Sequence, residues 1–483
     1  MSNCQAKSTL ALNSRQLLSF TMQLRPYQQR DVARIRDEYR NGKKAVLFVG
    51  PTGYGKTVLF AHIAKSAYER GKRVMILCHR QELIEQIVRA LQAVGLNPEI
   101  VAPGHTCQNS PLVVASVWTL INRLGSYDPP DLLVVDEAHH ATSKTTWGKI
   151  LNHWRDAKRL GVTATPIRLS GEGLDDLFDS MVVGPSTQDL INIRSLTPVT
   201  VYAPSTPDLT GIHKRGGDYV LSELESAITK SSVTGDAVST YRRLATGKRA
   251  IAFCVSVAHA KATADAFNRE GIKSEHIDGS LDSEERKRRI EDFRQGRTMV
   301  LTSCDLVSEG FDLPAIEVGI SLRPTASVGL WLQQVGRCLR TVDGKERAVI
   351  LDHAGNTHRH GLPTDEREWS LTGSEKKTRK APQESVAGVR TCKSCFACTS
   401  ATAQKCCECG EPFPVKARKI ETREGELQEV TNGGGKRVKF AEQKSAGSLE
   451  SLIALGKMRG YKNPRAWAEH VMRGRQQRRV RFV

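Results

Sequence analysis

The residues best suited to chemistry form the run Gly50–Thr57, with the sequence GPTGYGKT. An apolar, β-prone stretch at 45–49 precedes it, and a stretch of helical character at 58–64 follows it. A strand, a Gly-rich turn and a helix N-terminus in this order make a phosphate cradle, because the glycines let backbone N–H groups converge on a triphosphate. In such a cradle Lys56 reaches the β- and γ-phosphates and the Thr57 hydroxyl ligates Mg²⁺. A pattern this loose also arises by chance, so its context decides.

Two carboxylates, Asp136 and Glu137, directly follow an apolar run at 132–135. Carboxylates at the C-terminal edge of a parallel strand face the same crevice as a phosphate cradle. We expect Asp136 to hold Mg²⁺, directly or through water, and Glu137 to orient and deprotonate the attacking water. The alternative is that Asp136 caps a following helix. The phosphate cradle about 80 residues upstream argues against that alternative.

The cysteines fall into two groups. Six are scattered as reduced thiols, and six crowd into Cys392–Cys409, so a secreted disulfide protein is not indicated. Two Cys-x₂-Cys pairs in the crowded segment have the spacing of a structural, tetrahedral Zn²⁺ site, with Cys392, Cys395, Cys406 and Cys409 as ligands. Cys398 or Cys407 could replace a neighbour in this set. No nearby residue is suited to activate water, so the segment is interpreted as a binding or docking module.

The elements that must position these residues alternate along the chain. Apolar runs at 45–49, 73–78, 112–116 and 132–135 are separated by segments with helical spacing, such as 81–94. This pattern is typical of a parallel α/β sheet. A second alternation begins at 249–254 and continues with helices at 256–270 and 283–295 and a strand at 298–303, without a phosphate cradle of its own. The chain is therefore predicted to hold two parallel-sheet domains.

Several motifs in fixed order resemble those of superfamily 2 DEAD/DEAH-box helicases and translocases. Gly50–Thr57, Asp136–His139 and Thr163–Pro166 resemble motifs I, II and III, and Arg25–Gln28 resembles the adenine-recognising segment before motif I. Ser308–Asp312 and Gln333–Arg340 resemble motifs V and VI. The stretches at 322–328 and 350–356 are most similar to RadD-like prokaryotic and phage members that carry a C-terminal zinc module.

The resemblance implies two tandem RecA-like domains that bind ATP and Mg²⁺ between them. Arg337 and Arg340, on a helix expected to start near Val328, would act as arginine fingers; without the other motifs they would be taken as a solvated helix face. Asp312 would face the ribose. The expected ATP-binding residues are Arg25, Gln28, Pro51, Thr52, Gly53, Tyr54, Gly55, Lys56, Thr57, Gly310 and Asp312. The expected coupling residues, which link hydrolysis to domain closure, are His139, Thr163, Thr165 and Gln333.

A nucleic-acid partner is predicted from charge and from the resemblance. The formal net charge is +19 and the pI about 9.5, and residues 411–483 hold 17 Lys and Arg against 8 Asp and Glu, a net +9. The alternative for this region is a solvated basic tail. The resemblance makes His79, Arg80, Ser116 and Thr302 candidate backbone contacts, although helix capping or surface solvation would explain each. It also favours DNA over RNA, single-stranded or branched, with a single-strand-binding protein or a recombinase as a protein partner.

The predicted organisation has eight segments. They are a polar leader (1–21), a first domain (22–200), a linker (201–225), a second domain (226–362), a charged linker (363–390), a zinc module (391–414), a flexible linker (415–447) and a basic helical tail (448–483). In the tail, Trp467 would either contact nucleic acid or pack a small helical hairpin. No apolar run is long enough to span a membrane and no signal architecture is apparent, which favours the cytoplasm of a prokaryotic cell, with phage origin as one possibility.

The predicted function is that of an ATP-hydrolysing DNA helicase or translocase in repair, recombination or replication. Three alternatives stay open: an ATPase that loads or remodels a partner protein on DNA, the motor subunit of a restriction system, and an RNA helicase. A purely structural protein is disfavoured, because Lys56, Asp136, Glu137, Arg337 and Arg340 are all present.

Overall fold

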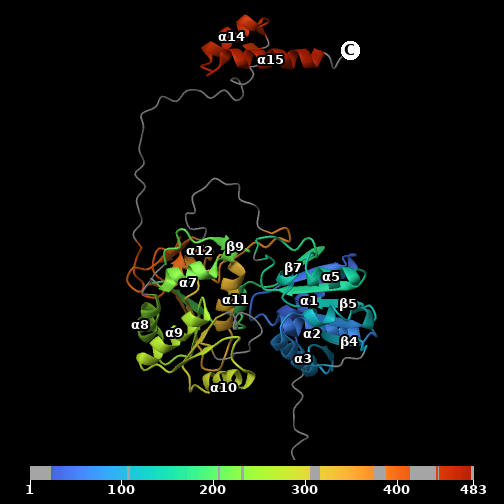
Figure 1. Ribbon diagram of the computed structural model, residues 1–483, viewed down its shortest axis with the longest axis vertical. Coiled ribbons are helices and arrows are strands. Elements are labelled where there is room, and N and C mark those ends of the chain that lie inside the picture. Colours follow the sequence, from blue (N-terminus) through green and yellow to red (C-terminus); the bar gives the residue numbers. More distant parts are fainter. Residues whose placement is uncertain are drawn as a thin grey trace, which may run out of the picture. The chain divides into compact units, whose positions relative to one another are not determined.

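The protein is represented by a computed structural model (Figure 1). It describes residues 23–105, 109–168, 170–204, 207–229, 233–304, 316–373, 388–413, 442–443 and 445–479. The chain forms two compact units, residues 1–415 and residues 416–483. The predicted leader and most of the predicted flexible linker lie outside the described residues. Among the described residues, no helix combines the length and the apolar character that crossing a bilayer requires.

The first domain of the larger unit is built on a sheet of seven parallel strands in the order β3-β4-β2-β5-β6-β1-β7. Strands β1, β2, β4 and β5 are buried along their whole length, because helices cover a parallel sheet. This burial explains their continuous apolar sequences. The strands are β1 (Ala45–Val49), β2 (Val74–Cys78), β3 (Glu99–Val101), β4 (Leu112–Ser116), β5 (Leu132–Val135), β6 (Lys158–Thr163) and β7 (Ser180–Val183). The helices are α1 (Pro26–Arg40), α2 (Lys56–Tyr68), α3 (Gln81–Ala93), α4 (Val117–Leu120), α5 (Thr146–His153) and α6 (Thr187–Asn192).

The second domain holds six parallel strands in the order β12-β13-β11-β14-β15-β8. Together the two sheets confirm the predicted α/β class with two parallel-sheet domains. The strands are β8 (Val199–Tyr202), β11 (Ala250–Phe253), β12 (Ser274–Ile277), β13 (Val300–Ser303), β14 (Val318–Ser321) and β15 (Ala348–Asp352). The helices are α7 (Leu221–Thr229), α8 (Val233–Ala245), α9 (Val257–Arg269), α10 (Ser283–Arg294), α11 (Val328–Cys338) and α12 (Asn356–His360).

The boundary between the domains differs from the prediction. β8 pairs with β15 and is the edge strand of the second sheet, although the first domain was expected to run to residue 200. The predicted linker 201–225 contains the end of β8, the hairpin of β9 (Lys214–Arg215) and β10 (Asp218–Tyr219), and the start of α7. A four-residue strand beside a segment rich in Pro and Gly gives too short a signal to be recognised in sequence.

The segment 363–373 also differs from the predicted charged linker, because it returns to the first domain. The Leu371 carbonyl accepts a hydrogen bond from the Leu174 N–H at 2.7 Å, and Glu172 forms an isolated β-bridge with Gly373. Trp369 and Leu371 pack against the apolar cluster that contains Phe178. Two apolar side chains therefore fix this part of the segment, and residues 374–387 lie outside the described part of the chain.

The cysteine-rich module is docked on the edge of the second sheet. Its hairpin consists of β16 (Val389–Thr391) and β17 (Cys398–Ser400). Tyr202 of β8 forms a β-bridge with Ala397, and the Ala203 N–H donates to the Phe396 carbonyl at 3.0 Å. The Glu408 carboxylate accepts from the Thr200 hydroxyl and from the Arg347 guanidinium, each at 2.9 Å. The module covers a strand edge that would otherwise expose unpaired backbone groups.

The smaller unit contains a helical hairpin of α14 (Leu449–Met458) and α15 (Pro464–Arg479), visible in Figure 1. A Cβ atom at Gly456 would lie 3.2 Å from the Trp467 ring, so the helices approach closely at this glycine. Trp467 also contacts Tyr461, with ring centroids 5.0 Å apart. Of the two predicted roles for Trp467, the described contacts agree with packing of a hairpin.

Candidate ATP site and metal centre

The Gly-rich run forms a turn between β1 and α2. Gly53 and Gly55 both have φ of 89°, a left-handed conformation that side chains disfavour, and Gly55 is the N-cap of α2. The helix therefore begins at Lys56 with its N-terminal N–H groups directed into the turn. The Lys56 ammonium donates to the Gly50 carbonyl at 3.1 Å. Burial lowers the pKa of Lys56, while the carboxylates of Glu137 and Asp136 act in the opposite direction.

Polar side chains of α1 form hydrogen bonds with residues of this turn. The Gln28 amide donates to the carbonyls of Tyr54 and Gly55 at 3.2 and 3.3 Å and accepts from the Arg25 N–H at 2.9 Å. The Tyr54 hydroxyl donates at 2.9 Å to Asp31, a carboxylate with no exposed surface. Tyr54 is itself buried, and its burial together with the Asp31 charge raises its pKa. The backbone of the turn is thus held by hydrogen bonds from a neighbouring helix.

The two carboxylates lie where β5 ends, at the edge predicted for them. Asp136 is 5% exposed and accepts the Glu137 N–H at 3.0 Å. Glu137 has φ of 47°, a left-handed conformation that is uncommon for a residue with a side chain. Such a conformation is kept only when the surroundings enforce it, and it is frequent at functional sites. Glu137 is the N-cap residue of the 3₁₀ turn Ala138–His140, so Asp136 does not have the capping role considered as an alternative.

The coupling residues form a chain across the two domains. His139 Nδ1 lies 3.0 Å from the Thr163 hydroxyl and 3.4 Å from a Glu137 carboxylate oxygen. Its Nε2 lies 3.4 Å from the Gln333 amide nitrogen of α11. The Thr163 hydroxyl in turn donates to the Thr165 carbonyl at 2.8 Å. The four residues expected to couple hydrolysis to closure thus form one connected series, in the order Thr165, Thr163, His139 and Gln333.

Helix α11 faces the first domain through two glycines. A Cβ atom at Gly336 would lie 2.3 Å from the Thr52 Cβ atom in the phosphate turn. A Cβ atom at Gly329 would lie 2.8 Å from the Thr165 hydroxyl. Gly329, Gln333 and Gly336 are spaced four and three residues apart and so lie on one helix face. This face brings the second domain into contact with the phosphate turn.

All five residues predicted to be catalytic line one cavity of about 300 Å³. Arg337 is 8% exposed and belongs to α11. Arg340 lies two residues beyond the end of that helix, so the expectation that both arginines are helical is wrong for Arg340. Its position depends on the loop that follows. The lining consists of Arg25, Thr52, Gly53, Gly55, Lys56, Thr57, Leu83, Gln86, Asp136, Glu137, Ser195, Gln333, Arg337, Arg340 and Thr341.

The remaining predicted contacts have mixed outcomes. Gly310 and Asp312 lie outside the described residues. His79 and Arg80 follow β2, and Ser116 ends β4; Ser116 pairs in register with Cys78, so the three lie at one sheet edge. The structure does not support Thr302 as a backbone contact. Its side chain has no exposed surface, and its hydroxyl donates to the Ala260 carbonyl at 2.8 Å. A hydroxyl buried under α9 does not reach a nucleic-acid backbone.

Sequence reasoning missed several residues at these sites. Trp118 is 59% exposed and follows Ser116 by two positions, and an exposed Trp next to a candidate backbone contact could have been flagged. Gln86 and Ser195 line the cavity, but neither belongs to a recognisable motif. Asp31 could have been suspected as an acidic residue on the apolar side of a helix.

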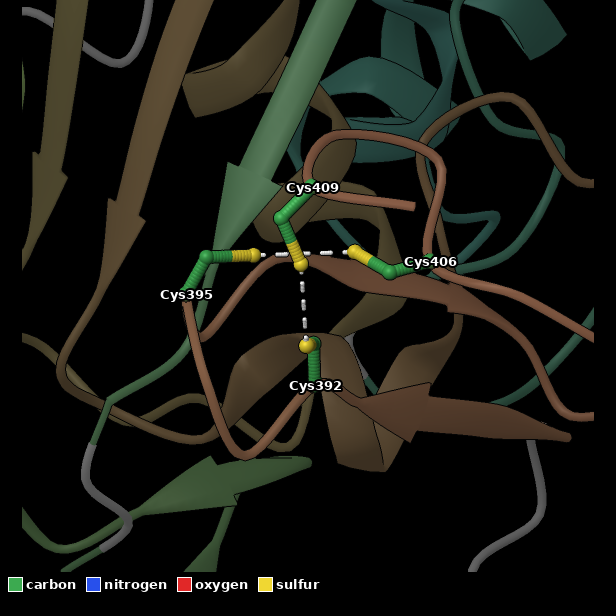
Figure 2. A group of neighbouring side chains, drawn as sticks. All are labelled: Cys392, Cys395, Cys406 and Cys409. Carbon is green, nitrogen blue, oxygen red and sulfur yellow. Dashed lines mark hydrogen bonds between the residues drawn. The ribbon is translucent and has the colours of Figure 1, made fainter. Parts of the chain in front are cut away.

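The four predicted zinc ligands converge (Figure 2). Cys392 and Cys395 belong to the first pair and Cys406 and Cys409 to the second, and all four sulfur atoms lie within 4.8 Å of one another. The Cys392–Cys409 and Cys395–Cys406 sulfur distances are 3.6 and 3.5 Å. A tetrahedral Zn²⁺ with bonds of about 2.3 Å places its sulfur ligands about 3.8 Å apart, so the donor set fits this ion.

The two other cysteines of the segment lie outside this cluster. The Cys398 sulfur is 3.4 Å from the Thr391 hydroxyl, and burial raises the pKa of its thiol to about 11. The Cys407 thiol points to the Cys398 carbonyl at 3.9 Å and is exposed. The described geometry therefore selects one set of four sulfur atoms from the six cysteines.

Comparison with known families gives two matches. Residues 21–168 match the family described as "Type III restriction enzyme, res subunit", and residues 234–342 match "Helicase conserved C-terminal domain". The first range contains β1–β6 of the first sheet, and the second contains β11–β14 of the second sheet.

Individual proteins resemble most of the chain. It is 33% identical over 414 residues to a "51.5 kDa protein" of a Lactococcus phage, covering 86% of this chain and 88% of that protein. It is 29% identical over 359 residues to the "Putative ATP-dependent helicase IRC3" of Saccharomyces cerevisiae, covering 69% of this chain. The chain spans about half (51%) of the length of that yeast relative.

Two solved structures share the fold. One is a fragment named as an HsdR subunit of a type I restriction enzyme from Vibrio vulnificus, with a TM-score of 0.56, 20% identity and coverage of 72% of this chain and 69% of that chain. The other is named as the ATP-dependent Type ISP restriction-modification enzyme LlaBIII bound to DNA, with a TM-score of 0.51, 18% identity and coverage of 68% and 27%.

Proposed function

The chain belongs to the superfamily 2 helicases, and on that premise we propose that it is a DNA helicase or translocase driven by ATP hydrolysis between its two RecA-like domains. The observation that carries the proposal is the single cavity lined by Lys56, Asp136 and Glu137 of the first domain and by Arg337 and Arg340 of the second. A nucleotide in this cavity would contact both domains, so its hydrolysis changes how they interact.

The proposal gives each residue a role that its position supports. The N-terminus of α2 and Lys56 bind the triphosphate, and Thr57 and Asp136 would hold Mg²⁺, which neutralises charge on the phosphates. Glu137 orients the attacking water and accepts its proton. Arg337 and Arg340 stabilise the charge that develops on the γ-phosphate, a contribution of about 10³–10⁵ in rate for arginine fingers.

Nucleic acid is proposed to bind at the C-terminal edge of the first sheet. His79 and Arg80 follow β2, and Ser116 and Trp118 follow the neighbouring strand β4. The His79 ring is tilted against the His140 ring, with centroids 4.5 Å apart, and the His140 ring lies 4.2 Å from that of His139 in the proposed coupling chain. Occupancy of this edge can therefore be transmitted to the ATP site through directly contacting rings. Aromatic stacking and backbone contacts of this kind are weak in sequence preference and sensitive to salt.

DNA rather than RNA is proposed as the track. The match to a restriction-enzyme family and the fold shared with an enzyme named as bound to DNA support this choice. The same two findings favour a second candidate, the motor subunit of a restriction system. In that case DNA would stimulate the ATPase, while strand separation would be absent.

The cysteine cluster is proposed to bind one structural Zn²⁺. Its docking on β8 through Glu408 and Ala397 supports a role in stabilising the second domain. None of the four cysteines is among the residues that line the ATP cavity, so the ion is proposed to be structural and not part of the hydrolysis site. The repair, recombination or replication context and the single-strand-binding or recombinase partner remain predictions.

The test is steady-state ATP hydrolysis without nucleic acid and with single-stranded DNA, duplex DNA, forked DNA or RNA, beside E137Q. We expect DNA to stimulate ATP hydrolysis strongly. We expect the rate of E137Q to be about 10²–10⁴-fold lower than that of the wild type, which is the usual contribution of a general base. E69Q is the matched control, because Glu69 is exposed at the end of α2. Stimulation by RNA alone would refute the choice of DNA. Stimulation without strand separation would favour the restriction motor.

A further inference from the structure

The loop between α11 and β15 contains a lysine whose ammonium is surrounded by main-chain carbonyls. Lys345 Nζ donates to the carbonyl oxygens of Ile316 and Arg340, each at 2.8 Å, and to that of Cys338. An ammonium has three N–H donors and no acceptor, so these three carbonyls use its full capacity. Two of the three carbonyls come from the last residue of α11 and from Arg340, two positions beyond it.

The same stretch of main chain is held from a second side by Thr197, which precedes β8. The Thr197 N–H donates to the Leu339 carbonyl at 2.8 Å, and its hydroxyl donates to the Arg340 carbonyl at 3.3 Å. The last carbonyls of a helix have no partner within the helix, and a cation near them is favoured by the helix dipole. Lys345 and Thr197 together satisfy the carbonyls of three consecutive residues, Cys338, Leu339 and Arg340.

We infer that Lys345 is a positioning residue for Arg340: it fixes the main chain that carries this arginine toward the γ-phosphate. The inference rests on the proposed function, in which Arg340 acts as an arginine finger. Arg337 belongs to the helix, whereas Arg340 lies past the helix end, in the loop whose main chain Lys345 contacts. A displacement of about 1 Å at a catalytic group costs about 10²-fold in rate, so this loop must be constrained for the finger to contribute.

An alternative role for Lys345 is general stabilisation of the second domain. The two roles differ in how Lys345 and Arg340 combine. If Lys345 acts through Arg340, its removal costs little once the guanidinium is gone. If it only stabilises the domain, its removal costs the same factor with or without Arg340.

The experiment measures kcat and KM for ATP in the full chain, at a saturating level of the most stimulating nucleic acid, for K345M, R340A and the double variant. We expect K345M to lower kcat about 10- to 100-fold with KM for ATP changed less than about threefold, because a transition-state contact is weakened while ground-state binding is kept. We expect R340A to lower kcat further and the double variant to match R340A. K287M is the matched control, since Lys287 is exposed on α10 of the same domain.

An unchanged kcat in K345M would overturn the inference, as would a double variant that falls below R340A by the full K345M factor. If R340A itself keeps its kcat, the finger assignment fails, and the inference fails with it. If thermal unfolding measurements show that K345M is not folded, T197V is used instead. That variant removes one donor to the Arg340 carbonyl, and we expect a smaller loss of kcat that also disappears in the R340A background.

Discussion

The Nε2 atom of His139 lies 3.4 Å from the amide nitrogen of Gln333, so a side chain beside Glu137, the proposed general base, meets a side chain on α11. His139 is also within 3.0 Å of the Thr163 hydroxyl. The first domain thus presents one connected polar chain to the second. A change in the separation of the domains would therefore alter the contact between His139 and Gln333.

We therefore expect Q333A to reduce the stimulation of ATP hydrolysis by nucleic acid. The ratio of stimulated to basal rate should fall about 5- to 150-fold, which corresponds to a typical coupling free energy of about 1–3 kcal/mol. H139A should have at least as large an effect, because it also removes the contacts with Thr163 and Glu137, and the double variant should be no worse than H139A. Q188A, at an exposed position of α6, is the control. Additive effects would contradict a shared contact.

A methyl group at Gly336 should hold the domains apart. The added Cβ would lie 2.3 Å from the Thr52 Cβ atom, well inside contact distance, and neither backbone can yield easily. We expect G336A to lower kcat by at least about tenfold, because α11 and the loop after it would carry the two proposed arginine fingers away from the phosphates. G125A is the control, since a Cβ there meets nothing within 4 Å. Normal turnover in G336A would show that the domains approach differently during hydrolysis.

The strands at 45–49, 112–116 and 132–135 were predictable to the residue, because a buried parallel strand is a short apolar run with clear ends. The four cysteines were predictable from their spacing alone. β8 and the segment 363–373 were not, because each is fixed by partners far away in sequence: β15 for the first and Leu174 for the second. The contacts of a single loop residue such as Lys345 leave no periodic signal at all.

The Tyr54–Asp31 hydrogen bond should contribute to ATP binding. Y54F keeps the ring contacts with Tyr27 and Phe48 but leaves a buried carboxylate oxygen without its donor. A hydrogen bond to a charged group is worth about 1.5–3 kcal/mol. We expect the midpoint of thermal unfolding of Y54F to fall by roughly 3–12 °C and its KM for ATP to rise. Y68F is the control, because Tyr68 is 39% exposed at the end of α2. If both quantities stay at the wild-type value, the hydrogen bond does not support the turn.

Metal analysis tests the cysteine cluster. We expect about one Zn²⁺ per chain, and close to none in C392S, because a structural site uses all four thiolates. Removal of the ion should also lower the thermal stability of the second domain, since Glu408 lies between two ligands and contacts Thr200 and Arg347. C407S is the matched control, because its sulfur lies outside the cluster. Loss of zinc in C407S would show that the ligand set is different.

The rate of hydrolysis should fall as the pH rises through about 8, because Lys345 loses its proton there. Burial lowers the pKa of Lys345 to about 8, although the nearby Glu317 carboxylate acts in the opposite direction. The neighbouring Cys338 thiol has its pKa raised to about 12 by burial and stays neutral in this range. Below pH 8 the ammonium keeps all three donors to the loop that carries Arg340, and above it one donor is lost.

The pH dependence of kcat and the pH dependence of stability have opposite signs, so a loss of kcat above pH 8 is not caused by unfolding through Lys345. A lysine with a lowered pKa in the folded state binds its proton more weakly than in the unfolded chain, so stability rises with pH between about 8 and 10.4 while kcat falls. The measurement is kcat from about pH 6.5 to 9.5 for the wild type and K345M, where the variant should lack the step near 8. Lys56, whose pKa burial also lowers, is present in both proteins and cancels in the comparison. The same step in both would assign it to another group and leave Lys345 without a role in the pH profile.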